Sequence, residues 1–276
     1  MAGKMKIKLL TLSYLIFVLA LFLSGALGDG IASDIVYYLS FILPVVICEL
    51  ALKKSGESTP ERMRVSGDGL LVSLSLAVPL ILITGLISLG TSSLIYALFG
   101  ASQSVALEGD IISNILKHAL LPAFLEEILF RYLPMRMMRG YRGWMTVIVS
   151  SLAFSVAHVS VYSALYAFVA GCLLMCVTLS SGSVIPAFVL HFINNLCSVL
   201  LMTYGWVEAF KTSYYVIICL LFVASIAVIF VFRSRFVRCI HRALTEGDNA
   251  EFPKETLLYI LPVMALAIMN FVGGLQ

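Results

Sequence analysis

Hydrophobic residues run along this chain in long stretches that short polar segments separate. A helix needs about 20 apolar residues to cross a hydrocarbon core of about 30 Å. Stretches of this kind lie near residues 9–27, 32–52, 69–90, 111–133, 144–158, 161–180, 184–204, 213–232 and 255–273. The pattern predicts an all-α fold, a polytopic membrane helix bundle with about eight or nine transmembrane helices.

Three stretches leave the count of helices open. The stretch at 144–158 is short for a membrane crossing, and residues 91–110 are compatible with an interfacial or partial helix. The first stretch follows three lysines and could be a signal peptide, but the many spans behind it favour a retained first helix.

Composition excludes the soluble classes. Of the 276 residues, 61% are hydrophobic and 12% are charged, whereas soluble domains have about 45–50% apolar and about 25% charged residues. The six cysteines are scattered through apolar stretches without the spacing of a zinc knuckle or a redox motif. A disulfide scaffold, a disordered chain and a soluble enzyme are therefore not expected.

Basic residues occupy every second polar segment. Lysine and arginine gather on the cytoplasmic side of membrane proteins, so this alternation predicts an integral membrane protein, in the plasma membrane, with a cytoplasmic N-terminus. These segments are interpreted as membrane-surface charge rather than as a nucleic-acid site. Their basic residues are Lys4, Lys6, Lys8, Lys53, Lys54, Arg62, Arg64, Arg136, Arg139, Arg142, Arg233, Arg235, Arg238, Arg242 and Lys254.

A few charged and polar residues remain inside the predicted spans. A charge at the bilayer centre costs about 2.5–3.5 kcal/mol on insertion scales, so such residues usually face a cavity and have a function. The candidates all lie in the middle of the chain: Glu126, Glu127, Arg131, His158, His191, Asn194 and Asn195.

Helical spacing sorts these candidates. Glu127 and Arg131 stand at i, i+4 and can form an ion pair. Glu126 lies about 100° away around the helix, which leaves its carboxyl unpaired and suited to proton transfer. His191 and Asn195 stand at i, i+4 and share a face.

Several chemistries are compatible with this set. A carboxylate and a histidine can activate water, while an imidazole and an amide can donate hydrogen bonds to an oxyanion. Glu126, His158 and His191 could instead bind zinc, although no HExxH motif is present. A transporter proton relay and purely structural roles, as an intramembrane ion pair and interhelical hydrogen bonds, also remain open.

Three short motifs carry a resemblance. Residues 126–131 match EExxxR, residues 154–158 match FxxxH, and residues 191–195 match HxxxN. In this order, on three membrane helices, they resemble the motifs of the CAAX prenyl protease and bacteriocin-processing (CPBP, or Abi) family of intramembrane endopeptidases. The resemblance covers about residues 110–200. It suggests N-terminal membrane helices at 1–108, a catalytic core at 109–204, and C-terminal helices with a cytoplasmic basic loop at 205–276.

The resemblance implies a role for each motif residue. Glu126 and His158 would activate water, His191 and Asn195 would form the oxyanion site, and Glu127 and Arg131 would support them. The implied substrate is a membrane-associated, possibly lipidated, peptide or protein, and no cofactor is expected, with zinc as the alternative. A non-enzymatic role in bacteriocin self-immunity or as a membrane scaffold is the competing hypothesis.

Overall fold

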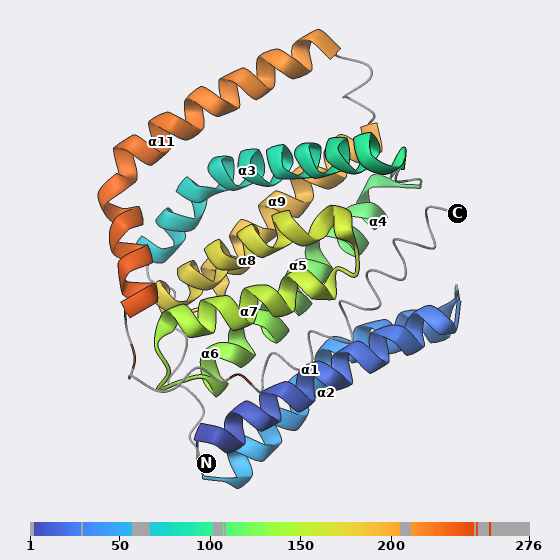
Figure 1. The fold of residues 1–276 in the computed structure, drawn as a ribbon, viewed down its shortest axis with the longest axis vertical. Helices are drawn as coiled ribbons and strands as arrows, with labels where there is room; N and C mark the ends of the chain where they lie inside the picture. The colour runs from blue at the N-terminus through green and yellow to red at the C-terminus, as the bar shows by residue number, and fades with distance from the viewer. Residues whose placement is uncertain are drawn as a thin grey trace.

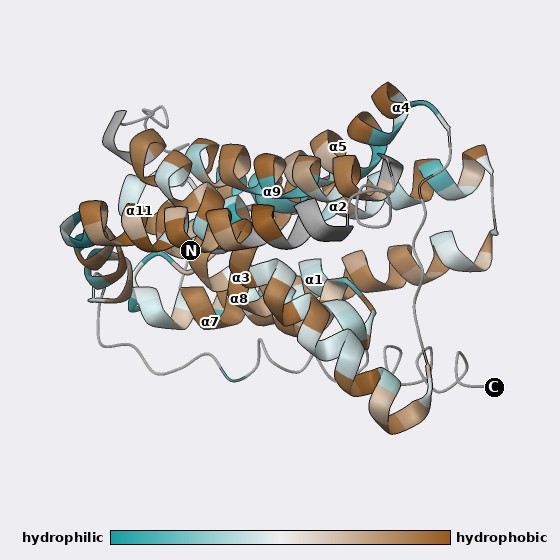
Figure 2. Cartoon of the chain, turned by 90° about the horizontal axis from the view of Figure 1, so that it is seen from above, coloured by the Kyte–Doolittle hydropathy of each residue, from teal (hydrophilic) through white to brown (hydrophobic). Residues whose placement is uncertain are grey.

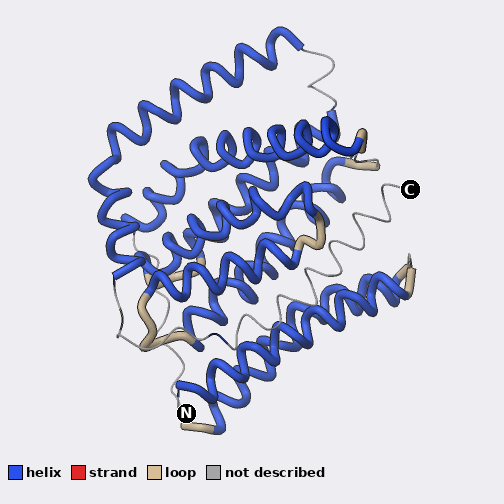
Figure 3. Tube along the Cα trace, in the orientation of Figure 1, coloured by secondary structure: helices blue, strands red, loops and turns tan. Residues whose placement is uncertain are grey.

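The computed structural model describes residues 3–28, 30–56, 67–101, 107, 109–204, 211–245, 247 and 254. In this part of the chain the secondary structure is helical and contains no strand (Figure 3). The predicted all-α class is therefore confirmed.

Six helices are long and apolar enough to cross a membrane, judged by length and composition within the described residues. They lie in α1 (Gly3–Ala26), α2 (Ile31–Lys54), α3 (Gly67–Phe99), α8 (Val161–Ser181), α9 (Ile185–Tyr204) and α11 (Lys211–Thr245). A shorter apolar helix, α7, spans Gly143–Ala157. The chain is an integral membrane protein, and the total of eight or nine spans stays a prediction.

A further helical run lies between α3 and α7. It consists, without a break, of α4 (Ile111–Ile115), η1 (Leu116–Leu120), α5 (Leu121–Glu127), η2 (Ile128–Tyr132) and α6 (Leu133–Met137). The first eight predicted stretches thus coincide with helices, and the ninth, 255–273, lies outside the described residues. Residues 91–99, which belong to the segment compatible with an interfacial or partial helix, continue α3.

Two prolines explain the π-helical turns of this run. Pro122 and Pro134 each follow a π segment, η1 and η2 respectively. Proline has no N–H, so it leaves the carbonyl four residues earlier without its α-helical donor. For Pro134 that carbonyl belongs to Phe130, and the Ser150 hydroxyl of α7 donates a hydrogen bond to it. Proline therefore widens the helix and α7 satisfies the freed carbonyl.

The helices form a bundle in which the run 111–137 lies centrally. In Figure 1, α1 and α2 lie side by side at the bottom of the view, and α11 crosses the opposite side beyond α3. One apolar core joins α1, α2, the run 111–137 and α7, with stacked and edge-on rings around Phe130. A second core joins α3, α8 and α9. The central run is held between the two.

Large apolar side chains cover the outside of the bundle. Hydrophobic colouring extends over most of the helices, and hydrophilic colouring gathers at ends such as those of α4 and α11 (Figure 2). On α11, Leu220, Val223 and Phe230 are more than half exposed. Such a surface is unfavourable in water and suits a hydrocarbon solvent.

Three basic segments meet at one end of the bundle. Gly3 of α1 lies beside the Tyr141 side chain, and Gly143, where α7 begins, packs against the backbone of Ala243 in α11. A Cβ at Gly143 would collide with the Ala243 carbonyl, so this close approach requires glycine. The start of α1, the segment between α6 and α7 and the C-terminal part of α11 therefore share an end of the molecule (Figure 1).

Candidate active site

His191 of α9 is bonded to a carboxylate of the central run. Its Nδ1 donates a hydrogen bond to Oε1 of Glu127 in α5 over 2.9 Å. Both side chains are buried, with Glu127 only 1% exposed. A carboxylate at Nδ1 fixes the ring orientation and keeps the proton on that nitrogen, which leaves Nε2 facing the rest of the site.

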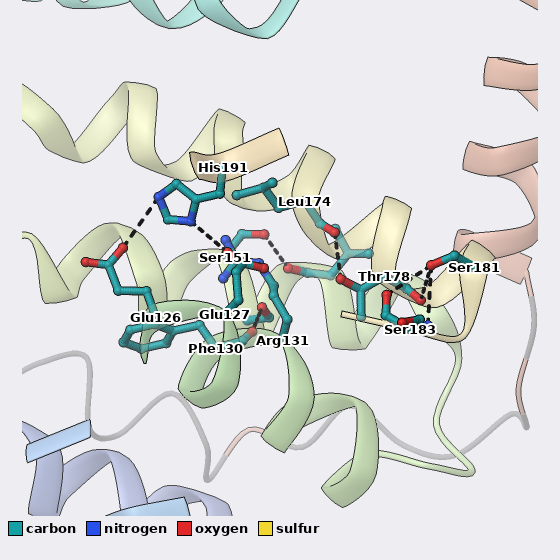
Figure 4. A network of polar contacts seen from close by, with 12 residues as sticks. Glu126, Glu127, Phe130, Arg131, Ser151, Leu174, Thr178, Ser181, Ser183 and His191 are labelled. Carbon is teal, nitrogen blue, oxygen red and sulfur yellow. Dashed lines mark hydrogen bonds and ion pairs between the residues drawn. The ribbon is translucent and has the colours of Figure 1, made fainter. Parts of the chain in front are cut away.

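Glu126 faces the other side of the same imidazole. Its Oε2 lies 3.6 Å from Nε2 of His191, and its side chain is 15% exposed. Figure 4 shows His191 between the two glutamates. Helical spacing had suggested that Glu126 points away from the Glu127 contact. In the structure both glutamates face the same imidazole. This is possible because the two ring nitrogens of His191 lie on opposite edges of the ring, so that Nδ1 faces Glu127 and Nε2 faces Glu126.

Glu127 also pairs with Arg131, as their spacing predicts. Nε of Arg131 lies 3.5 Å from Oε2 of Glu127, and the Arg131 side chain is fully buried. The guanidinium carbon lies 4.4 Å from the ring centroid of Phe154, a cation–π contact. Arg131 thus brings a positive charge to a site that contains two carboxylates.

His158 lies at the C-terminal end of α7. Its Nδ1 donates to the carbonyl oxygen of Phe154 over 2.9 Å, which leaves Nε2 as the basic nitrogen of a neutral ring. Within the described residues no hydrogen bond or ion pair joins His158 to Glu126 or His191. The joint activation of water by Glu126 and His158, which the resemblance implies, therefore stays a prediction.

Phe154 connects the two histidines. Its ring packs edge-to-face against His158 at 4.7 Å between centroids and against His191 at 5.6 Å. The Arg131 guanidinium lies over the face of the same ring. The spacing of Phe154 and His158 indicated a shared face, but nothing in the sequence indicated that one ring contacts three polar site residues.

The turn after His158 has a strained backbone. Only residues 158–160 separate α7 from α8, and Val159 has φ +47°. A β-branched residue rarely adopts this left-handed conformation. The Ser155 hydroxyl donates to the Ala164 carbonyl across the turn at 2.6 Å. This short connection places His158 at the end of α7 where the chain turns into α8.

Asn195 lies one turn beyond His191 on α9 and is half-buried. It forms no hydrogen bond within the described residues. Its neighbour Asn194 accepts a hydrogen bond from the Thr84 hydroxyl of α3 at 3.1 Å. The structure thus gives Asn194 a partner between helices and leaves the Asn195 amide free for a ligand.

A second charged cluster lies at the end of the central run and was missed from the sequence. Nη1 of Arg136 lies 2.7 Å from Oε2 of Glu49 in α2, and the Tyr132 hydroxyl donates to Oε1 of Glu49 at 3.0 Å. Arg136 was assigned to a basic loop, whereas it belongs to α6 and is buried. The cluster ties α2 to the helix that carries Glu126.

The described residues do not bring three metal ligands together in this arrangement. Among the described residues no group of three or more His, Cys, Asp or Glu side chains could hold a metal ion. Glu126 and His191 face each other, but within the described residues no hydrogen bond or ion pair joins His158 to either of them. No catalytic step is therefore derived through a metal.

The comparisons with known proteins agree with the motifs. The sequence model of the family described as type II CAAX prenyl endopeptidase Rce1-like matches residues 108–197. This segment contains the motif residues from Glu126 to Asn195. A search of the curated proteins found no match, and neither did a search of the solved structures. Residues 108–197 of this membrane protein are thus similar to the Rce1-like family of type II CAAX prenyl endopeptidases.

Proposed function

We propose that this protein is an intramembrane endopeptidase that hydrolyses a peptide bond of a membrane-associated peptide or protein, with or without a lipid modification. The family match supports a protease, and the apolar outer surface supports a substrate that reaches the site from the membrane. The observation that carries the proposal is the buried imidazole of His191 held between the carboxylates of Glu126 and Glu127.

Water activation is assigned to Glu126, with His158 as a second base. Glu126 is the more exposed of the two glutamates, and in the described part of the chain its carboxylate forms no hydrogen bond or ion pair other than that with His191. His158 keeps its proton on Nδ1 and therefore offers Nε2 as an acceptor. A water molecule held by these two groups would lose one proton to the Glu126 carboxylate as its oxygen attacks the peptide carbonyl. The C–N bond then breaks, and the leaving amine takes up that proton.

The oxyanion site is assigned to His191 and Asn195. With His191 protonated, the charges of Glu126, Glu127, Arg131 and His191 sum to zero, which favours burial of the group. Nε2 of His191 and the amide of Asn195, one turn apart, would then donate to the developing oxyanion. Glu127 and Arg131 hold the imidazole in place and touch no substrate.

The proposed topology places the N-terminus in the cytoplasm and the protein in the plasma membrane. Three basic segments lie at one end of the bundle and support it: the start of α1, the segment between α6 and α7, and the C-terminal part of α11 (Figure 1). Cysteine variants at Lys4 and Arg139 should react with an impermeant maleimide from the cytoplasmic side of the membrane. Labelling from opposite sides would contradict this topology.

The proposal is tested by comparing peptides released from membranes that contain the wild-type protein or Glu126→Gln. The variant should lose cleavage by about 10²-fold or more, because a positioned acid–base group contributes about 10²–10⁴-fold. Asp110→Asn is the matched control, since asparagine also caps a helix N-terminus and Asp110 caps α4 far along the same run. Full proteolysis by a folded Glu126→Gln protein would refute the mechanism. An unchanged cellular phenotype would favour a non-enzymatic immunity or scaffold role.

A further inference from the structure

Four buried polar atoms that have no hydrogen-bond partner among the described residues lie together behind the proposed active site. They are Nε, Nη1 and Nη2 of Arg131 and Oε2 of Glu127. Arg131 is fully buried and Glu127 nearly so. Buried polar groups are almost always hydrogen-bonded to protein or to ordered water, and a charged donor is the most costly to leave unsatisfied.

The contacts of Arg131 do not satisfy these donors. Its Nε lies 3.5 Å from Oε2 of Glu127, an ion pair without a hydrogen bond. The Phe154 ring covers the face of the guanidinium at 4.4 Å. Guanidinium N–H groups point outward in the plane of the group, so a ring on its face cannot accept them.

Several neighbouring protein groups already have other hydrogen-bond partners. The Ser150 hydroxyl donates to the Phe130 carbonyl, and the Ser151 hydroxyl donates to the Val147 carbonyl at 2.6 Å. Oε1 of Glu127 is taken by His191. Figure 4 shows Arg131 beneath Glu127, with Phe130 and Ser151 beside it. The donors of Arg131 and the acceptor of Glu127 are thus adjacent and enclosed.

We propose that ordered water occupies a buried site between the Nη atoms of Arg131 and Oε2 of Glu127. Water suits this site because it accepts from the guanidinium and donates to the carboxylate with the same molecule. An anion would match Arg131 but would be repelled by Glu127. A hydrated cluster also explains how a full charge persists at this depth in an apolar bundle.

The position of this water site gives it a role that rests on the proposed function. Only the Glu127 carboxylate separates it from His191, whose Nε2 faces Glu126. A hydrolase inside a membrane consumes one water in each turnover, and hydrocarbon does not supply it. The site at Arg131 holds water next to the reacting groups.

The test is hydroxyl-radical footprinting of the wild-type protein in lipid nanodiscs in H₂¹⁸O, read by mass spectrometry. Phe154 should be labelled although it is almost inaccessible to bulk water, because radicals form from the bound water beside it. Phe17 is the matched control, since it is equally buried, at 2% exposure, and packs against Phe41 and Phe130. Labelling of Phe154 severalfold above Phe17 supports the water site, and equal labelling overturns it.

Two further arms separate the alternatives. Glu126→Gln should retain the labelling of Phe154 while losing cleavage, so the water site and the proposed mechanism can fail independently. Crystals of the protein grown in bromide should show no anomalous peak at Arg131. A bromide peak there would overturn the assignment in favour of an anion.

Discussion

Oε1 of Glu127 accepts a hydrogen bond from Nδ1 of His191 across the contact between α5 and α9, two segments that are 64 residues apart in sequence. This bond sets the tautomer and the orientation of the imidazole. It also couples the EExxxR motif to the HxxxN motif, which sequence spacing alone had left as separate helices.

Glu127→Gln should therefore impair catalysis without removing a proposed water-activating group. Glutamine can still accept from Nδ1, but it lacks the charge that stabilises a protonated imidazole. We expect kcat to fall by about 10²–10⁴-fold with little change in KM, as for the loss of a carboxylate behind a catalytic histidine. Steady-state cleavage in proteoliposomes measures this, and wild-type kcat would show that the bond has no catalytic role.

Phe154→Leu should lower activity more than its effect on stability explains. The variant removes the ring that contacts His158, His191 and Arg131. Phe130→Leu is the matched control, because Phe130 is equally buried and packs on Tyr14, Phe17 and Phe154 rather than on the histidines.

Both leucine variants should lose about 1–3 kcal/mol in the free energy of unfolding, measured by titration with SDS. Only Phe154→Leu should lower kcat by a further factor of about ten, which corresponds to about 1.4 kcal/mol of transition-state stabilisation. Equal kcat values for the two variants would show that Phe154 serves packing alone.

Arg136→Met should destabilise the contact between α2 and the central run. Arg136 is buried and bonded to Glu49, whose side chain is 28% exposed. We expect a loss of about 1–3 kcal/mol, below the figure of about 3–5 kcal/mol for breaking a fully buried pair, because solvent reaches Glu49. A double-mutant cycle with Glu49→Gln isolates the pair, and additive effects would argue against coupling.

Val159→Gly should lower the free energy of unfolding less than Val156→Gly, a substitution about one helical turn earlier. Val156 has helical geometry, where glycine costs about 1 kcal/mol relative to alanine. At Val159 the positive φ penalises any side chain by about 1–2 kcal/mol, and glycine relieves this strain. The free energy of unfolding of Val156→Gly, measured by SDS titration, should therefore be about 1–2 kcal/mol lower than that of Val159→Gly. The reverse order would contradict the strained turn.

Metal chelation should leave proteolysis intact. The proposed mechanism uses carboxylate, imidazole and amide groups of the chain itself. Dialysis of the purified protein against EDTA, followed by the cleavage assay, checks this. Loss of activity that added zinc restores would instead assign Glu126, His158 and His191 to a metal site formed in the active conformation.

The membrane class, the helices and the candidate residues follow from local properties of the chain. Apolar stretches of helical length form helices wherever they lie in a bilayer, because each must satisfy its backbone hydrogen bonds internally. Costly polar residues such as Glu126 and His191 stand out against that background. The i, i+4 contact of Glu127 with Arg131 is equally local, and it is present.

Contacts between helices depend on how the bundle packs. Two contacts join segments that are distant in sequence: the hydrogen bond of Glu127 with His191 and the ion pair of Arg136 with Glu49. The Phe154 ring, in turn, is contacted by side chains from more than one helix. Periodicity fixes which face a residue occupies but not which helix that face meets. The angle between Glu126 and Glu127 around their helix follows from the sequence alone. The His191 imidazole that both of them face belongs to another helix, and only tertiary packing brings it to them.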